Sequence, residues 1–335
     1  MKKKIIIIAE AGVNHNGSLI LAKRLIDLAV NAKADYVKFQ LYDTESFVKD
    51  NALLAPYQKK NTKFDYSQKT MLKKYELSFE DIKELLIYSK KKKIKFLCTP
   101  FDITSIKNLK KLKVNIFKIA SPDLDNFPLF YNLRNGVKKI FISTGMSSIS
   151  DITKTIKFLE KINIKKSKLI LLHCVSDYPA KKNDLNLNAI KLIRERFKIK
   201  VGFSDHSEGS LASVVATTLG AEVIEKHITL NKKLPGPDHS SSMNEKEFTN
   251  FVRLIRDTQI VLGKKSKEIT KNEKKNFKMV KRSVFFNNDV KKGSKLKISD
   301  FICLRPRKKL KSINWEKIQN KTAKKNYKKG EFIDI

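Results

Sequence analysis

Short apolar runs alternate with longer amphipathic stretches along the first three-quarters of the chain. The short runs are rich in Ile, Val, Leu and Phe, as strands are, whereas the stretches between them repeat apolar residues at helical spacing. The predicted strands are 4–9, 35–40, 94–98, 115–120, 138–143, 168–173, 199–204 and 222–227. The predicted helices are 18–32, 79–92, 102–112, 126–134, 149–161, 186–197, 209–219 and 245–262.

A strict alternation of strands and helices predicts an α/β fold of the (β/α)8 TIM-barrel type over residues 1–263. A doubly wound open sheet is the alternative, but no glycine-rich nucleotide-binding sequence follows any predicted strand. The connection 41–78 is long for a compact barrel. Because loops of that length usually bind a ligand or cover a site, we expect this one to border the functional site.

The pattern changes after Gly263. Residues 264–280 are mostly charged and polar, which predicts a linker. Residues 281–335 contain two strand-like runs, a short predicted helix near 312–320 and a strand-like end at 330–335. They predict a small β domain, whose length of about 55 residues makes it marginal alone and favours packing on another surface.

The formal net charge of +37 comes from 71 Lys and Arg against 34 Asp and Glu, and nine of the 71 are Arg. The lysines are spread along the whole chain, which is typical of solvated helix faces. A nucleic-acid reader concentrates basic residues and relies on Arg. We therefore expect no nucleic-acid partner, with a basic RNA-binding protein as the non-enzyme alternative, and we expect the charge to attract anionic substrates.

The cysteines and the first residues indicate a cytoplasmic location. Cys98, Cys174 and Cys303 lack CxxC spacing and cannot all pair, which suits a reducing compartment, and the first two are expected to be core thiols. The lysine-rich start resembles a signal peptide, but Glu10 interrupts its apolar stretch, which predicts a first strand instead. No run approaches the roughly 18–20 apolar residues of a membrane span, so we expect no membrane partner.

Every histidine lies at or just beyond the end of a predicted strand. The five are His15, His173, His206, His227 and His239. His206 and His227 end consecutive strands, and two imidazoles there could share one divalent ion while leaving positions for water and substrate oxygens. His15 is interpreted as stabilising a turn or orienting Glu10, and His173 as packing beneath the site.

Lys38 and Lys118 occupy matching positions within the second and fourth strands. A lysine inside an apolar strand is costly unless it is paired. One interpretation is that both point outward between helices or pair with Glu10 or Glu225. The other is that both ammonium groups hold a bound dianion, such as a phosphate or phospho-carboxylate, with help from nearby hydroxyls. The candidate hydroxyls are Thr99, Ser121, Ser143 and Ser204.

Two acidic residues are candidates for contacting sugar hydroxyls or for proton transfer. Glu10 ends the first predicted strand, and Asp238 follows a Pro-Gly-Pro turn after the eighth. Such a turn either caps a loop or fixes a carboxylate at the mouth of the barrel, and the sequence leaves both open. Ser148 and Asp102, by contrast, are expected to cap the helices that follow them.

Several motifs occur in one order along the chain: AEAGVNHNG, VKFQ, APYQKKNT, STGM, GFSDHS, IEKHITL, GPDH, KRSVFFNNDVKKG and LRP. Together they resemble the sialic acid synthase family over essentially the whole sequence. The resemblance implies a (β/α)8 barrel joined to a small antifreeze-like (β-clip) domain at 281–335. It also implies a domain-swapped homodimer in which that domain covers the partner's barrel.

The resemblance further implies a metal-dependent condensation. Phosphoenolpyruvate would react with N-acetylmannosamine or a related acetamido-mannose to give an N-acetylneuraminate-type nine-carbon 2-keto acid and phosphate, with Mn²⁺ or Mg²⁺. Legionaminate and pseudaminate synthases share the motifs, and another phosphoenolpyruvate–aldose condensing enzyme is a further alternative. A metal-dependent barrel hydrolase would carry an HxH pair on its first strand, where this chain has only NHN.

Site residues follow from the family's motifs. The implied metal ligands are His206 and His227. The implied phosphoenolpyruvate-binding residues are Lys38, Gln40, Thr99, Lys118, Ser121, Ser143, Ser176 and Ser204. The implied sugar-binding residues are Tyr178, Asp238 and, from the partner subunit, Arg305; the implied catalytic acids are Glu10, Asp123 and Asp238.

The sequence departs from the family pattern at two places. Pro122 and Asp123 stand where a small residue and then Glu or Asp are common, and Asp has the shorter reach. Residues 307–309 are Arg-Lys-Lys where glycines are usual, which alters the surface that would meet the partner. We expect the contacts that select the sugar to come from 41–78 and from the segment after the eighth strand.

Overall fold

The computed structural model describes residues 4–62, 67–308 and 310–333. The chain divides into two compact units, Met1–Gly263 and Lys264–Ile335, and each is described by itself. Of the residues considered above, 1–3 of the lysine-rich start, 63–66 of the long connection, Lys309 and the last two of the 330–335 segment lie outside the described part. No helix in the described part has the length and apolar character needed to cross a membrane.

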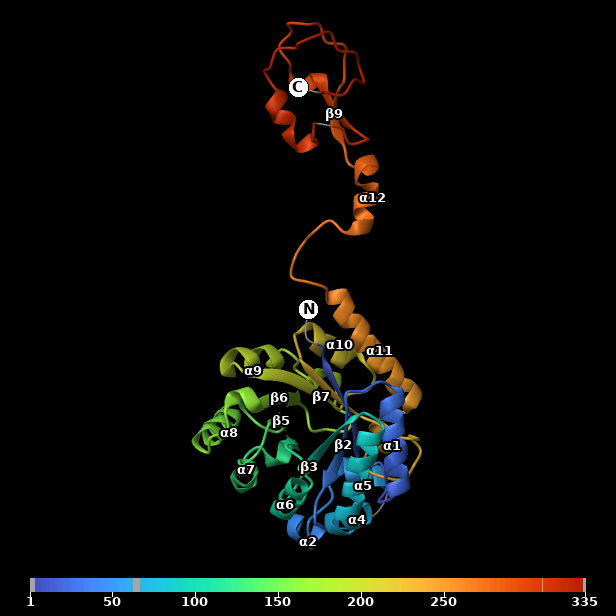
Figure 1. Ribbon diagram of the computed structural model, residues 1–335, viewed down its shortest axis with the longest axis vertical. Helices are drawn as coiled ribbons and strands as arrows, with labels where there is room; N and C mark the ends of the chain where they lie inside the picture. Colours follow the sequence, from blue (N-terminus) through green and yellow to red (C-terminus); the bar gives the residue numbers. More distant parts are fainter. Residues whose placement is uncertain (1–3, 63–66, 309, 334–335) are drawn as a thin grey trace. The chain divides into compact units, whose positions relative to one another are not determined.

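The first unit is a closed barrel of eight parallel strands with helices around it (Figure 1), so the predicted barrel is confirmed. Neighbouring strands in the sequence are neighbours in the barrel, and β8 closes on β1. The strands are β1 Ile6–Gly12, β2 Tyr36–Leu41, β3 Lys95–Pro100, β4 Ile116–Ile119, β5 Lys139–Ser143, β6 Leu169–Cys174, β7 Lys200–Asp205 and β8 Val223–His227.

The helices between the strands lie close to their predicted positions. They are α1 Leu19–Asn31, α5 Phe79–Lys91, α6 Ile103–Lys111, α7 Phe127–Leu133, α8 Ile149–Lys161, α9 Ala189–Phe197, α10 Leu211–Thr218 and α11 Glu245–Leu262. Asp102 and Ser148 accept hydrogen bonds from the first turns of α6 and α8, which confirms their interpretation as caps. Such caps typically stabilise a helix by ~1 kcal/mol.

The long connection after β2 is not an open loop. Its described residues form three short helices, α2 Thr44–Phe47, α3 Pro56–Thr62 and α4 Gln68–Tyr75. Short helices of this kind show too few turns to produce a recognisable apolar period. Single 3₁₀ turns occur elsewhere in the barrel unit: η1 Ser121–Asp123, η2 Lys166–Lys168, η3 Lys182–Asp184 and η4 His239–Ser241.

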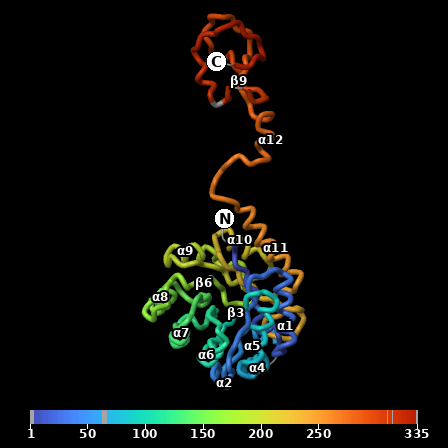
Figure 2. Tube along the Cα trace, viewed as in Figure 1, coloured from blue at the N-terminus to red at the C-terminus, as the bar shows by residue number. Residues whose placement is uncertain are grey.

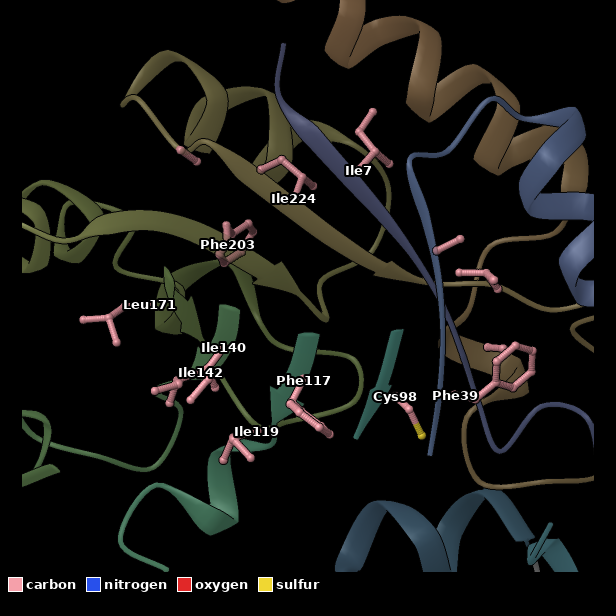
Figure 3. Close-up of a cluster of buried hydrophobic side chains, with 14 of the residues drawn as sticks. Ile7, Phe39, Cys98, Phe117, Ile119, Ile140, Ile142, Leu171, Phe203 and Ile224 are labelled. Carbon is pink, nitrogen blue, oxygen red and sulfur yellow. The ribbon is translucent and has the colours of Figure 1, made fainter. Parts of the chain in front are cut away.

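Strand alternation sends one set of side chains outward to the helices and the other inward. Figure 3 shows outward residues such as Phe39, Phe117 and Phe203 in the core between strands and helices. Inside the barrel, a separate apolar cluster is formed by Ile8, Tyr36, Leu97, Phe141, Ile170, Leu172 and Val223. This cluster fills the barrel beneath the carboxyl ends of the strands. The inward residues that come after it along the strands therefore lie above the cluster, at the carboxyl ends.

The second unit begins with α12 Lys271–Val280, which lies in the predicted linker. None of the side chains of α12 is buried. Its large apolar residues, Phe277, Met279 and Val280, all lie in its second half, so the charged first half showed no helical period in the sequence. Thr270 and Glu273 form a capping box that starts it.

The rest of the second unit has its own core. β9 Ser283–Phe286 pairs antiparallel with β10 Phe301–Leu304, and the predicted helix near 312–320 is a 3₁₀ helix, η6 Ser312–Ile318. A shorter 3₁₀ turn, η5 Ile298–Asp300, precedes β10. In the predicted last strand, the described residues form one isolated bridge, Phe285 with Phe332. Figure 2 traces the unit in orange and red, and its core consists of Val284, Phe286, Val290, Leu296, Ile318, Ala323, Tyr327 and Ile333.

Gly202 on β7 marks a point where the barrel interior leaves no room for a side chain. A Cβ there would lie 2.5 Å from the Val223 carbonyl oxygen and 2.6 Å from Cδ2 of Leu172. The strand carbonyl cannot move away without disturbing the β7–β8 ladder. We predict that Gly202→Ala lowers the free energy of unfolding by roughly 1–3 kcal/mol, measured by urea denaturation. An unchanged midpoint would show that the interior is looser than these distances indicate.

Candidate active site

A cavity of about 530 Å³ lies at the carboxyl ends of the barrel strands. The strand ends form its floor, and residues of the 41–78 connection and of the loops after β6 and β8 complete its lining. Most of the predicted site residues line it: Glu10, Lys38, Gln40, Thr99, Lys118, Ser121, Ser143, Ser176, Tyr178, Ser204, His206, His227 and Asp238. Segments far apart in the sequence therefore meet at one hollow, as the barrel prediction requires.

Four buried charged side chains form the floor of the cavity, and we call them the charge quartet: Glu10, Lys38, Lys118 and Glu225. The Nζ atom of Lys38 lies 2.8 Å from Oε1 of Glu225 and 3.5 Å from Oε2 of Glu10. The Nζ atom of Lys118 lies 3.4 Å from the same Glu225 oxygen. The predicted pairing with Glu10 and Glu225 is confirmed, whereas the outward orientation between helices is wrong, because both lysines line the cavity. Pairing with glutamate is also compatible with binding a dianion, which stays a prediction.

The surroundings shift the pKa values of the quartet in different directions. Burial raises the pKa of Glu10 from 4.5 to about 7, even though Lys38 lowers it. Burial would also raise the pKa of Glu225, but Lys118 and Lys38 hold it well below its ordinary range. Burial lowers the pKa of Lys118 to about 8, whereas Glu10 and Glu225 keep Lys38 charged. At neutral pH the floor therefore carries more positive than negative charge, and it favours an incoming anion.

Hydroxyl groups surround the quartet. Ser204 donates to Oε1 of Glu225 at 2.9 Å, while Oε2 of Glu225 and the Ser143 hydroxyl are buried without a hydrogen-bond partner among the described residues. Buried polar atoms are seldom left unpaired in a native structure. Their presence beside two ammonium groups indicates that this space is built for a polar ligand.

Gly145, which follows β5, lets two of the predicted serines converge. A Cβ on Gly145 would lie 2.3 Å from the Ser176 hydroxyl oxygen and 2.8 Å from that of Ser121. The Gly145 backbone N–H also donates to the Ser121 hydroxyl at 3.0 Å. The glycine of the STGM motif is therefore needed for the shape of the cavity, a role that the motif alone did not reveal.

The imidazoles of His206 and His227 lie side by side, with ring centroids 5.4 Å apart. Nδ1 of His206 lies 2.8 Å from the Val175 carbonyl oxygen, so the Nδ1–H donates there and Nε2 is the nitrogen that could bind a metal after losing its proton. Nδ1 of His227 is buried without a hydrogen-bond partner in the described chain. Burial holds the pKa of His227 well below its usual value, so its 3.7 Å approach to Asp238 joins a neutral ring to a carboxylate.

These donors fit a divalent ion bound by two protein ligands. Among the described residues, no group of three or more His, Cys, Asp or Glu side chains could hold a metal ion by itself. One nitrogen from each imidazole would leave the other coordination positions to water and substrate oxygens. Burial would lower the pKa of His206, but Cys174 and the Val175 carbonyl raise it, so metal binding at this ring would displace a proton.

A buried ion pair fixes the spacing of the two histidines. Asp205 and Lys226 directly precede them and are partners in the β7–β8 register, with Oδ2 of Asp205 3.2 Å from Nζ of Lys226. Asp205 also accepts a hydrogen bond from the Ser207 backbone N–H at 2.8 Å. The pair lies on the opposite strand face from the imidazoles, which the alternation in SDH and EKH makes possible.

An aromatic stack forms one side of the cavity. The Tyr178 ring stacks on His206 with centroids 4.1 Å apart, and Tyr57 from α3 lies 4.7 Å from Tyr178. Asp238 is buried nearby, and burial raises its pKa to about 6. The sequence did not single out Tyr57, which lies in the 41–78 connection, because its place in the site depends on how α3 folds back.

The structure places Asp123 outside the cavity. Asp123 is buried in η1, where its Oδ1 accepts a hydrogen bond from Asn126 at 2.9 Å, and it is not part of the cavity lining. Its position therefore does not support its assignment as a catalytic acid. Arg305 is exposed in the second unit, which is described by itself, so its sugar-binding assignment stays a prediction.

The other histidines have local structural contacts. Nδ1 of His15 accepts a hydrogen bond from the Gly17 backbone N–H at 3.1 Å, which confirms the turn interpretation and not an interaction with Glu10. Nε2 of His173 lies 2.7 Å from the Leu185 carbonyl oxygen, and Nδ1 of His239 lies 2.7 Å from the Thr229 hydroxyl. These three rings stabilise the loops around the site.

The two barrel cysteines differ in their surroundings. Cys98 packs in the core between strands and helices, as predicted for a core thiol. Cys174 is also buried, but it lines the cavity with its sulfur 3.6 Å from Nδ1 of His206. The core-thiol interpretation of Cys174 was therefore incomplete, because β6 turns this residue inward.

Comparison with known proteins identifies the family. The sequence profile of the NeuB family matches residues 25–267. The N,N'-diacetyllegionaminic acid synthase of Campylobacter jejuni is 41% identical over 331 residues, covering 99% of both chains. The enzyme of the same name from Legionella pneumophila is 41% identical over 302 residues, covering 90% of this chain and 85% of that one.

A solved structure agrees with these relatives. The N-acetylneuraminic acid synthetase of Leptospira borgpetersenii is 35% identical, with a TM-score of 0.71 over 82% of this chain and 90% of that chain. The match to the family profile extends over most of the barrel unit that carries the cavity. The chain therefore belongs to the NeuB family of sialic acid synthases.

Proposed function

We propose that the protein condenses phosphoenolpyruvate with an N-acetylated mannose-type sugar and releases phosphate, forming a nine-carbon 2-keto-3-deoxy acid. The observation that carries the proposal is the charge quartet, in which the buried Lys38 and Lys118 share Glu225 on the floor of the cavity. The imidazoles of His206 and His227 line the same cavity. The names of the relatives, which are synthases of sialic and diacetyllegionaminic acids, support the same reaction class.

Phosphoenolpyruvate would bind on the floor of the cavity. Its carboxylate and phosphate would take the ammonium groups of Lys38 and Lys118 as partners. Polar side chains around the quartet would complete the site: Gln40, Thr99, Ser121, Ser143, Ser176 and Ser204. Held in this way, the substrate needs orientation and charge compensation from the protein, and no covalent attachment.

A divalent ion, Mn²⁺ or Mg²⁺, would bind His206 and His227. It would supply a Lewis acid that polarises the aldehyde oxygen of the sugar. Tyr178 and Asp238, which border the imidazole pair, would orient the sugar chain. Glu10, whose pKa lies near 7, is suited to accept a proton and return it.

The chemistry requires one new carbon–carbon bond and the loss of phosphate. The enol carbon of phosphoenolpyruvate attacks the aldehyde carbon, whose oxygen takes up a proton to become a hydroxyl, and positive charge develops at the carbon that bears the phosphate. Water adds to that carbon and gives one proton to a base. When the carbon–oxygen bond to phosphate breaks, the added oxygen loses its second proton and becomes the ketone oxygen. The floor of the cavity holds the negative substrate groups through these steps.

The proposal extends to the assembly. The second unit has its own core and an exposed Arg305, which is consistent with an antifreeze-like domain that covers the barrel of a partner subunit in a homodimer. In that assembly Arg305 would contact the acyl-amino group of the sugar. Free Cys98, Cys174 and Cys303 support a cytoplasmic location.

The first prediction concerns the metal. After dialysis against EDTA, the protein is expected to release no phosphate from phosphoenolpyruvate, and Mn²⁺ together with an acetamido-mannose substrate should restore release. His206→Ala should lower the rate by on the order of 100-fold or more because it removes one of two protein ligands. Phosphate release measures the reaction rate, and circular dichroism shows whether His206→Ala is still folded.

His173→Ala is the matched control for this experiment. His173 ends the neighbouring strand β6 but bonds to the Leu185 carbonyl oxygen and is not part of the cavity lining. The His173→Ala variant should show the same dependence of phosphate release on metal as the unmodified protein. Release of phosphate without sugar, or full activity of His206→Ala, would argue against the proposal.

The second prediction concerns pH. Lys118 loses its charge as pH rises through about 8, because its folded pKa is lowered to that value. Since kcat/KM reports the free enzyme, kcat/KM for phosphoenolpyruvate should fall by up to about tenfold per pH unit above that point. In Lys118→Met, the value should be low throughout and this alkaline decline should disappear. If Lys118→Met shows the same alkaline decline in kcat/KM, a group other than Lys118 causes the decline.

A further inference from the structure

A second cavity lies at the amino ends of the barrel strands, opposite the candidate active site, and we call it the amino-end cavity. Its volume is about 250 Å³, which suits a small ligand. Its lining comes from the starts of β1, β5, β7 and β8 and from α11, with Lys139 and Lys200 among the lining residues. The proposed condensation uses none of these residues.

A lysine begins each of three alternate strands: Lys95 in β3, Lys139 in β5 and Lys200 in β7. Strand alternation directs all three toward the barrel axis, because each precedes an inward-facing residue by two positions. Those inward-facing residues are Leu97 and Phe141 of the inner apolar cluster and Gly202, which packs against that cluster. Since side chains from alternate strands share a layer in a (β/α)8 barrel, the three lysines form one layer at its amino-terminal mouth.

Two carboxylates compensate part of the positive charge at this mouth. Nζ of Lys200 lies 3.7 Å from Oε2 of Glu222, which also lines the amino-end cavity, and both side chains are nearly half-exposed. Lys4 lines the cavity too, and its Nζ atom lies 2.8 Å from Oδ1 of Asp35. Exposed pairs of this kind are weak, so they leave the lysines available to a ligand.

The other two lysines of the layer are not compensated in this way. Among the described residues, neither Lys139 nor Lys95 has a carboxylate within ion-pair distance. The Nζ atom of Lys95 lies 5.3 Å from the centroid of the Tyr36 ring. Burial lowers the pKa of Lys139, and the charges of Lys200 and Lys95 lower it further. An anion between these ammonium groups would relieve their mutual repulsion.

The amino-end cavity also offers apolar contacts. Val223 and Ile170 belong to the inner apolar cluster and Ile6 packs against it, and all three line the cavity. Leu262 of α11 lines it as well. The carbon part of a ligand could therefore bury apolar surface while its charged part stays near the lysines.

We propose that the amino-end cavity binds a small phosphorylated molecule, with its phosphate held by Lys139, Lys200 and Lys95 and its carbon part against the apolar side chains. Lysine binds phosphate well as a compact positive charge. Because (β/α)8 enzymes react their substrates at the carboxyl ends of the strands, this ligand is not a substrate. The inference does not depend on the proposed condensation, since the two cavities lie at opposite ends of the strands.

Calorimetric titration of the full-length chain tests the site, with neither metal nor sugar present. The probes are phenyl phosphate and inorganic phosphate, which carry similar charge and differ in their apolar part. All titrations use Lys118→Met as background, because it weakens anion binding in the candidate active site. Phenyl phosphate should bind about tenfold more tightly than inorganic phosphate, because its ring buries apolar surface. Equal affinities, or no binding of phenyl phosphate, would overturn the inference.

Variants added to this background locate the binding. Lys139→Met together with Lys200→Met should weaken phenyl phosphate binding by about tenfold, because it removes two charged partners of the phosphate. Lys157→Met together with Lys161→Met is the matched control, since it removes the same charge from exposed positions of α8 outside the cavity. The control pair should change the affinity by less than about twofold. An equal loss in both pairs would assign the binding to the overall charge of the protein.

A chemical measurement on the unmodified protein gives the position of the ligand even if a lysine variant does not fold. N-hydroxysuccinimidyl acetate acetylates accessible lysines, and peptide mass spectrometry measures the rate at each one. At about ten times its Kd, phenyl phosphate should slow the acetylation of Lys139 by about tenfold and leave that of Lys157 unchanged. The same rate at Lys139 with and without phenyl phosphate would contradict the site.

Discussion

Two lysine ammonium groups are buried inside the barrel, and the rest of the site follows from how their charge is compensated. Burying one unpaired ammonium group costs several kcal/mol. Glu225 offsets this cost by approaching both Lys38 and Lys118, while burial keeps Glu10 only partly ionised at neutral pH. The two ammonium groups, set against Glu225 and a partly ionised Glu10, leave the floor with a small net positive charge. This charge attracts an anion such as phosphoenolpyruvate, and the proposed divalent ion on His206 and His227 would supply the further positive charge that its two or three negative charges require.

The barrel makes this arrangement possible because the side chains that stabilise the fold and those that form the site lie in different layers. Outward side chains and helices form the main core, and the inner apolar cluster that includes Phe141 and Leu172 closes the barrel beneath the site. The inward residues above that cluster can then be polar without weakening the main core. The ion pair of Asp205 and Lys226 adds rigidity where the two imidazoles must keep their spacing.

Much of this architecture could be predicted from the sequence, since strand and helix periods are local signals. Most strand ends differ by a residue or two from their predicted positions. The strand β1 is longer than predicted: it continues past Glu10 to Gly12, with an irregular pairing to β2 between these two residues. The helix α12 was missed because its first half is entirely charged and polar and shows no apolar period. The contributions of Tyr57, Gly145 and Cys174 to the cavity depend on contacts between distant segments, which local patterns do not encode. Asp123 shows the converse: it was assigned from a motif at a place where the sequence departs from the family pattern, and its side chain is not part of the cavity lining.

The most direct test of the account is a crystal structure of the protein with phosphoenolpyruvate and Mn²⁺. The account predicts the phosphate and carboxylate oxygens within hydrogen-bond distance of the Lys38 and Lys118 ammonium groups, and the metal on His206 and His227. Phosphoenolpyruvate bound elsewhere, with Glu225 still the partner of both lysines and the imidazoles without metal, would contradict it.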